Sequence, residues 1–188
     1  MGNRGGAIHN EAREIVRTYK SRRWITCVLE FRGRKRTVMT PNRYTELFFL
    51  DEAVAFAAGH RPCAECRRDR YNAFQAAWKR RIDSNGDAGA DAMDAVLHPS
   101  RIDRHRKQVI YQASLDSLPN GTFVEITGAP YLVWDRALFL WTPERYTKKT
   151  TRSSRMTVTV LTPQPIVECF RQGYVPMIHE SWRAEDRS

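Results

Sequence analysis

The sequence lacks any apolar run close to the ~20 residues that a membrane-spanning helix requires. Its first residues also lack the apolar core of a secretory signal. Three catalytic motifs are missing as well: His-Glu-x-x-His, Gly-x-Ser-x-Gly and the phosphate-binding loop. From these absences we expect a soluble cytoplasmic protein with no membrane partner, and motifs alone assign no enzyme class.

Cysteine and acidic residues are both scarce. Only four cysteines occur, unevenly spaced, which argues against a disulfide framework and favours reduced thiols with a metal site. Asp and Glu total 21 against 31 Lys and Arg, so the net charge is +10. This surplus favours a polyanionic partner. Nucleic acid is favoured over a membrane surface, because no basic amphipathic helix with a bulky apolar face stands out.

Hydrophobic periodicity predicts the elements of the first part of the chain. We expect a helix over residues 10–20, a strand over 24–31 that turns at 32–35 and returns over 36–39, and an extended segment over 44–49. Asp51 should cap a helix over residues 52–58 that ends at Gly59. The strongest helical pattern covers residues 67–81, where Tyr71, Phe74 and Trp78 share one face.

The remainder changes from helical to extended character. A polar loop at 83–89 precedes a helical region that starts near residue 90, is interrupted near Pro99 and resumes over 101–111. We then expect strands over 122–126, 131–134, 138–141 and 157–161, a helix over 165–172 and a last strand over 174–179. The predicted class is α+β. It comprises a zinc-knuckle N-terminal part (1–82), a helical connection (83–118) and an antiparallel β-rich C-terminal part (119–188).

The most informative segment is residues 59–68, GHRPCAECRR, which contains Cys63 and Cys66 as a Cys-x-x-Cys knuckle. Two thiols at this spacing can bind one tetrahedral ion, and zinc is the usual choice. The arginines around them favour the thiolate form that a metal needs. A thioredoxin-like redox pair is the alternative, but that reading needs a strand before the motif, whereas here a helix pattern ending in glycine precedes it.

A structural zinc site needs more ligands than this pair supplies. Cys27 is the preferred third ligand, because a strand facing a knuckle often completes such a site. Cys169 lies in an apolar helical stretch and is expected in the core. The fourth ligand stays open among the five histidines, which are His9, His60, His98, His105 and His179.

Residues 50–67 resemble the second half of the zinc-binding module of Ada-type methylphosphotriester DNA-repair proteins. The shared features are an acid-capped alanine-rich helix, then Ala-Gly, then Arg-Pro-Cys-x-x-Cys-Arg. His60 stands where the family has an aromatic residue, and Arg68 where it has a closing proline. The resemblance implies a cysteine zinc site on a small α+β unit that approaches DNA backbone. The family's upstream Cys-x-x-x-Cys pair carries the methyl-accepting thiolate, and here Cys27 alone stands upstream.

Three basic clusters are candidates for phosphate contacts, with DNA favoured over RNA. One occupies the predicted hairpin tip, one the start of the strongest helix, and one a predicted loop over residues 146–155. The proposed contacts are Arg34, Lys35, Arg36, Arg67, Arg68, Lys148, Lys149 and Arg152.

Together these features predict a zinc-stabilised nucleic-acid-binding protein, with catalytic residues unassigned. The alternative is an enzyme acting on nucleic acid, either an Ada-like cysteine alkyl acceptor or a metal-dependent nuclease. A nuclease would draw on His98 and His105 with Asp103 or Glu65. The segment that holds Asn3, Arg4, Gly5 and His9 is a further candidate site.

Overall fold

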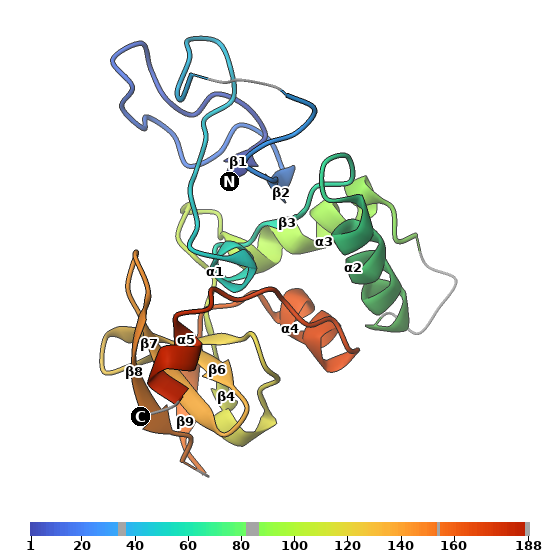
Figure 1. Cartoon of the computed structure of the whole chain (residues 1–188). Coiled ribbons are helices and arrows are strands. Elements are labelled where there is room, and N and C mark those ends of the chain that lie inside the picture. Colours follow the sequence, from blue (N-terminus) through green and yellow to red (C-terminus); the bar gives the residue numbers. More distant parts are fainter. Residues whose placement is uncertain (34–36, 82–86, 154, 187–188) are drawn as a thin grey trace.

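Figure 1 shows the computed structural model of the protein, which describes residues 1–33, 37–81, 87–153 and 155–186. The helices are α1 (Glu52–Ala57), α2 (Arg68–Arg81), α3 (Ala90–Arg101), α4 (Gln164–Arg171) and α5 (Trp182–Asp186), with one 3₁₀ turn at Leu115–Ser117. None of the described helices has the length and apolar character needed to cross a membrane. Helices and largely antiparallel sheets occur together, which confirms the predicted α+β class.

A small sheet lies near the N-terminus, with β2 (Trp24–Thr26) between β1 (Gly2–Arg4) and β3 (Arg61–Pro62). β1 runs antiparallel to β2, and β3 runs parallel to it. The sheet therefore joins the start of the chain to the segment that directly precedes the Cys-x-x-Cys knuckle.

The helix before β3 begins and ends as its sequence predicts. Asp51 is the N-cap of α1 and accepts a hydrogen bond from the backbone N–H of Val54 at 2.9 Å. After α1, Gly59 adopts a left-handed φ of +80°, where a Cβ would lie 2.8 Å from Cδ of Arg101. Glycine thus allows the chain to turn sharply into β3 against a buried arginine.

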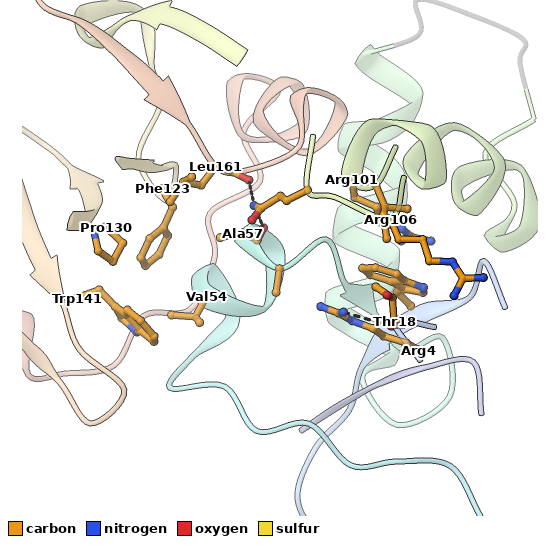
Figure 2. A pocket seen from close by; sticks show the side chains of 14 residues that line it. Arg4, Thr18, Val54, Ala57, Arg101, Arg106, Phe123, Pro130, Trp141 and Leu161 are labelled. Atoms are coloured by element: carbon orange, nitrogen blue, oxygen red, sulfur yellow. Dashed lines mark hydrogen bonds between the residues drawn. The ribbon is translucent and has the colours of Figure 1, made fainter. Parts of the chain in front are cut away.

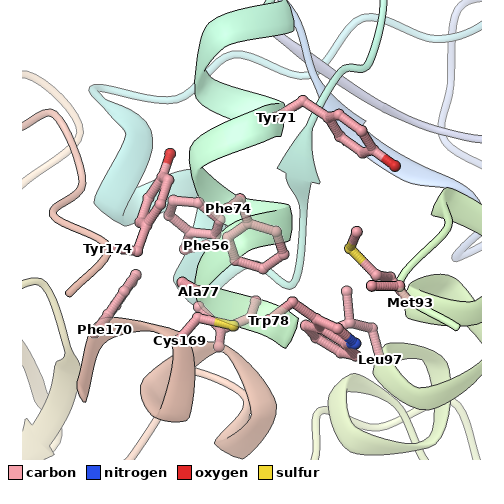
Figure 3. Packing of buried hydrophobic residues seen from close by; sticks show 12 residues of the cluster. Phe56, Tyr71, Phe74, Ala77, Trp78, Met93, Leu97, Cys169, Phe170 and Tyr174 are labelled. Atoms are coloured by element: carbon pink, nitrogen blue, oxygen red, sulfur yellow. The ribbon is translucent and has the colours of Figure 1, made fainter. Parts of the chain in front are cut away.

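The largest core cluster is centred on α2 (Figure 3). Tyr71, Phe74 and Trp78 are buried on one face of this helix, as the sequence predicts. They pack with Phe56 of α1 and with apolar residues of α3 and α4. Cys169 of α4 is fully buried in this cluster, which confirms its predicted place in the core.

The second sheet contains six strands in the order β4-β9-β5-β6-β7-β8, all antiparallel. Their bounds are β4 (Tyr111–Ser114), β5 (Phe123–Ile126), β6 (Ala129–Trp134), β7 (Ala137–Trp141), β8 (Tyr146–Thr151) and β9 (Thr157–Val160). In Figure 1 this sheet lies below the small sheet, and α4 lies beside α2. Helix α4, which follows the last strand of this sheet, thus packs into the core around α2.

Several expectations about secondary structure were wrong. Residues 10–20 contain no helix, because the chain doubles back at Arg13 (φ +62°) and His9 pairs with Ile15 in a β-bridge. The first strand ends at Thr26 rather than at residue 31, and α3 ends at Arg101 with Pro99 still helical. Residues 146–151 form a strand instead of a loop, and 174–179 form no strand. Of the predicted hairpin, residues 34–36 lie outside the described residues, and 37–39 form no strand.

Candidate metal centre

Three cysteines meet at the end of the small sheet. Cys27 directly follows β2 and Cys63 directly follows β3, so the parallel pairing places them side by side. The backbone N–H of Cys63 donates to the carbonyl oxygen of Thr26 at 2.9 Å, which extends this pairing to the knuckle. Cys66 lies in the turn before α2. The sulfur atoms of Cys27, Cys63 and Cys66 all lie within 4.8 Å of one another, close enough to hold a metal ion.

Hydrogen bonds set the charge within this cysteine cluster. The Cys27 thiol beside Cys63, aided by backbone N–H groups of Cys66 and Glu65, lowers the pKa of Cys63 to about 5. The N–H of Glu65 lies 3.4 Å from the Cys63 sulfur. The bond to Cys63 raises the pKa of Cys27, and burial raises it further. Burial also raises the pKa of Cys66. One thiolate is thus stabilised by its neighbours, and a second or third requires a nearby cation.

Each of the five candidate histidines makes other contacts. His9 Nδ1 lies 2.6 Å from Thr45 Oγ1, and His179 Nδ1 lies 3.0 Å from Ser181 Oγ. His98 packs edge-on against Tyr19, and His105 Nε2 accepts from Arg104 Nε at 3.0 Å. Among the residues that the structure describes, the three cysteines are the only group of this kind, so no histidine joins them and none forms the alternative nuclease centre.

His60, next to the knuckle, is fully buried rather than a ligand. Its ring lies 5.5 Å from that of Trp24 and 4.8 Å from that of Phe49. Burial holds the pKa of His60 well below its usual value, and the charges of Arg4 and Arg101 lower it further. The neutral ring therefore takes the place of an apolar core residue.

A cavity of about 230 Å³ opens beside the cysteine cluster. Apart from the three cysteines, its walls comprise Asn3, Ile25, Val28, Leu29, Phe31, Tyr44 and Glu65. A metal held by three thiolates would therefore have space for an external ligand on this side.

A buried carboxylate connects the knuckle to α1. Glu52 is fully buried and accepts from Arg67 Nη1 at 3.1 Å, from Arg70, and from the backbone N–H of Met177 at 2.9 Å. This network holds the first turn of α2 against α1, and we did not predict it from the sequence. The only sequence feature that indicates this network is an acidic residue at the first position of α1, Glu52, together with the arginines that follow Cys66.

The basic residues predicted to contact nucleic acid fall into separate places. Arg34, Lys35 and Arg36 lie outside the described residues. Arg68 is exposed at the start of α2, and Lys148 and Lys149 are exposed on β8, on another part of the molecule (Figure 1). Two of the arginines are engaged by the protein itself: Arg67 pairs with Glu52, and Arg152 donates to the carbonyl oxygens of Leu115 and Leu118.

Comparisons of the chain with models of known families, with curated proteins and with solved structures found no match.

Proposed function

We propose that the protein is a zinc-stabilised nucleic-acid-binding protein in which Cys27, Cys63 and Cys66 hold the ion. The observation that supports zinc most strongly is the close approach of three thiols from two sequence-distant segments. Soft thiolate ligands favour zinc over hard cations such as magnesium or calcium. Bound zinc would supply a structural cross-link between the end of β2, the end of β3 and the turn before α2.

The spacing of the sulfur atoms fits this ion. A zinc–sulfur distance of about 2.3 Å in a tetrahedron places neighbouring sulfurs about 3.8 Å apart. The three sulfurs lie within 4.8 Å of one another, a range that includes this spacing. The Ada-like pattern of residues 50–67 is consistent with the same choice, and the fourth ligand would enter from the adjacent cavity.

Nucleic acid is the proposed partner because the chain carries a net charge of +10 and exposes cations at two described places, Arg68 and Lys148–Lys149. Lysines and arginines on phosphates give affinity that falls with salt and reads little sequence. Double-stranded DNA is the first partner to test, since the Ada-like knuckle would bring Arg68 towards a DNA backbone.

Metal stoichiometry tests the zinc half of this proposal. Native mass spectrometry of the purified protein should detect one zinc per chain, and Cys63→Ser should abolish it. Cys169→Ala, which alters a core thiol outside the cluster, should retain the zinc. Protein without bound metal, or zinc retained in Cys63→Ser, would overturn the assignment.

Gel retardation tests the nucleic-acid half. Labelled duplex DNA and RNA of equal length should be retarded at low salt and released as salt rises. No retardation of either at low salt would remove the nucleic-acid partner and leave the zinc result unaffected.

A second candidate function, alkyl transfer to a cysteine, is favoured by the cavity that opens on all three thiols. One thiolate sulfur would bond to the methyl carbon of a methylphosphotriester, the methyl C–O bond would break, and the phosphodiester anion would leave. Peptide mass mapping after incubation with such DNA should then find one methylated cysteine within the cluster. Unmodified cysteines after prolonged incubation would exclude this activity.

A further inference from the structure

A cleft of about 370 Å³ lies away from the cysteine cluster, between the small sheet and the six-stranded sheet (Figure 2). Helix α1 forms its middle, through Val54 and Ala57. One end is lined by Arg4, Arg101 and Arg106, and the other by Phe123, Pro130 and Trp141. This volume is within the usual range for small-molecule sites, and each end has a distinct chemical character.

The arginine end has a surplus of positive charge, because its one carboxylate partner among the described residues, Asp94, is shared between Arg101 and Arg61. The described residues that line the cleft include three arginines and no Asp or Glu. Arg4 and Arg101 both lie over the indole ring of Trp24, at 4.1 and 4.5 Å. Burial lowers the pKa of Arg4 to about 10 and that of Arg101 to about 9. Desolvated guanidinium groups favour an anion as a partner.

Arg101 has a donor without a partner. Its side chain is 1% exposed, and its nearest carboxylate, Asp94, is 3.9 Å away and bonds mainly to Arg61. The Nη atoms donate to the carbonyl oxygens of Gly59 and Arg22, but Nε has no hydrogen-bond partner among the described residues. Nε of Arg4 is equally buried and equally unpartnered within the described chain. Buried donors of this kind usually pair with a water, an ion or a ligand, so both Nε atoms can take an anion as partner.

The opposite end is apolar and aromatic. Phe123 of β5, Pro130 of β6 and Trp141 of β7 line one wall, as Figure 2 shows. Phe123 is 3% exposed and Trp141 is half-buried, so Trp141 offers the larger aromatic surface. Nε1 of Trp141 is buried and has no partner among the described residues. Aromatic side chains of this kind stack on nucleobases, and an indole N–H can donate to a base acceptor.

We propose that this cleft binds a nucleotide, with its phosphate at Arg4, Arg101 and Arg106 and its base against Phe123 and Trp141. The site shares no residue with the cysteine cluster and does not depend on zinc or on the basic clusters proposed above. The same chemistry can come from a free mononucleotide or from one nucleotide unit of a single strand. Comparing the affinity for a mononucleotide with that for a single strand distinguishes these two sources.

Isothermal titration calorimetry with adenosine 5′-monophosphate and with a short single-stranded oligonucleotide tests this site. Arg106→Ala removes an exposed guanidinium and keeps the Cβ, so the fold should remain intact while affinity for either probe falls about tenfold or more. Trp141→Leu should weaken the nucleotide about tenfold yet leave inorganic phosphate binding unchanged. Arg104→Ala, an exposed arginine outside the cleft, is the matched control and should bind as wild type.

Tighter binding of the oligonucleotide would identify a strand as the source, and tighter binding of the monophosphate a free nucleotide. Circular dichroism and thermal unfolding confirm that each variant folds. The proposal is overturned if neither probe binds at millimolar concentration, if Arg106→Ala and Arg104→Ala behave alike, or if inorganic phosphate binds as tightly as the nucleotide.

Discussion

Arg61 and Asp94 form a buried two-point ion pair, with Nη2 2.7 Å from Oδ2 and Nε 3.2 Å from Oδ1. Their side chains are 2% and 4% exposed. Arg61 lies on β3, two residues before Cys63, and Asp94 lies on α3. The pair therefore ties the strand that presents the knuckle to the helical core.

Breaking this pair should destabilise the protein strongly. Asp94→Ala leaves the Arg61 guanidinium buried without its carboxylate, which costs about 3–5 kcal/mol. Urea unfolding measures the loss. Asp91→Ala is the matched control, because Asp91 is 85% exposed and pairs with Arg23 at the surface. Its effect should stay below about 1 kcal/mol, and equal losses in the two variants would contradict this account.

Arg67 and Arg68 are neighbours with opposite expected roles. Arg67→Ala removes one of the cations that neutralise buried Glu52, so it should lower the free energy of unfolding by about 1–3 kcal/mol. Arg68 is exposed, so Arg68→Ala should leave stability within about 0.5 kcal/mol and weaken DNA retardation. Urea unfolding and gel retardation of both variants separate these effects. A reversal of the two phenotypes would contradict the assignment of Arg68 to the interface.

His60 should make stability depend on pH. Its pKa is lowered in the fold, so the unfolded chain takes up a proton first as pH falls below about 6.5. Stability is therefore lost as pH falls from the unfolded pKa towards the folded one. His60→Leu removes this contribution, so by about pH 5.5 wild type should have lost roughly 1 kcal/mol more than the variant, relative to pH 7.5. If wild type and His60→Leu lose the same free energy of unfolding between pH 7.5 and 5.5, His60 does not cause the pH dependence.

The lysines of β8 should contribute to the salt dependence of DNA binding. If both lysines contact phosphates as proposed, replacing Lys148 and Lys149 together by alanine should reduce the slope of log K against log salt by about 1.8 for duplex DNA. Lys79→Ala, which alters an exposed lysine near the far end of α2, should leave the slope unchanged. An unchanged slope in the double variant would place the interface elsewhere.

Local patterns predicted the elements whose residues interact with near neighbours. The Asp51 cap, the stop at Gly59 and the buried face of α2 all follow from short-range spacing. Residues 10–20 have a helical spacing, yet their backbone bonds instead reach β1 and the chain around Ile8, which no local rule anticipates. β8 was missed because its lysine and threonine side chains are mostly exposed, so no apolar alternation marks it.

The candidate sites also differ in how far the sequence alone predicts them. Cys27 was grouped with the knuckle because it was expected on a strand that faces the knuckle, and the parallel pairing of β2 with β3 supplies the proximity. The Glu52 network and the arginine cleft depend on side chains from segments far apart in the sequence. Only the tertiary fold brings Arg4 and Arg101 over the same indole ring.

X-ray absorption at the zinc edge of the purified protein tests the central proposal most directly. Three thiolates and one lighter ligand predict three sulfur neighbours at about 2.3 Å and one nitrogen or oxygen at about 2.0–2.1 Å. Cys27→Ser should reduce the sulfur count to two. A zinc ion surrounded by oxygen and nitrogen alone, or a protein that carries no zinc, would contradict the assignment of Cys27, Cys63 and Cys66 as its ligands.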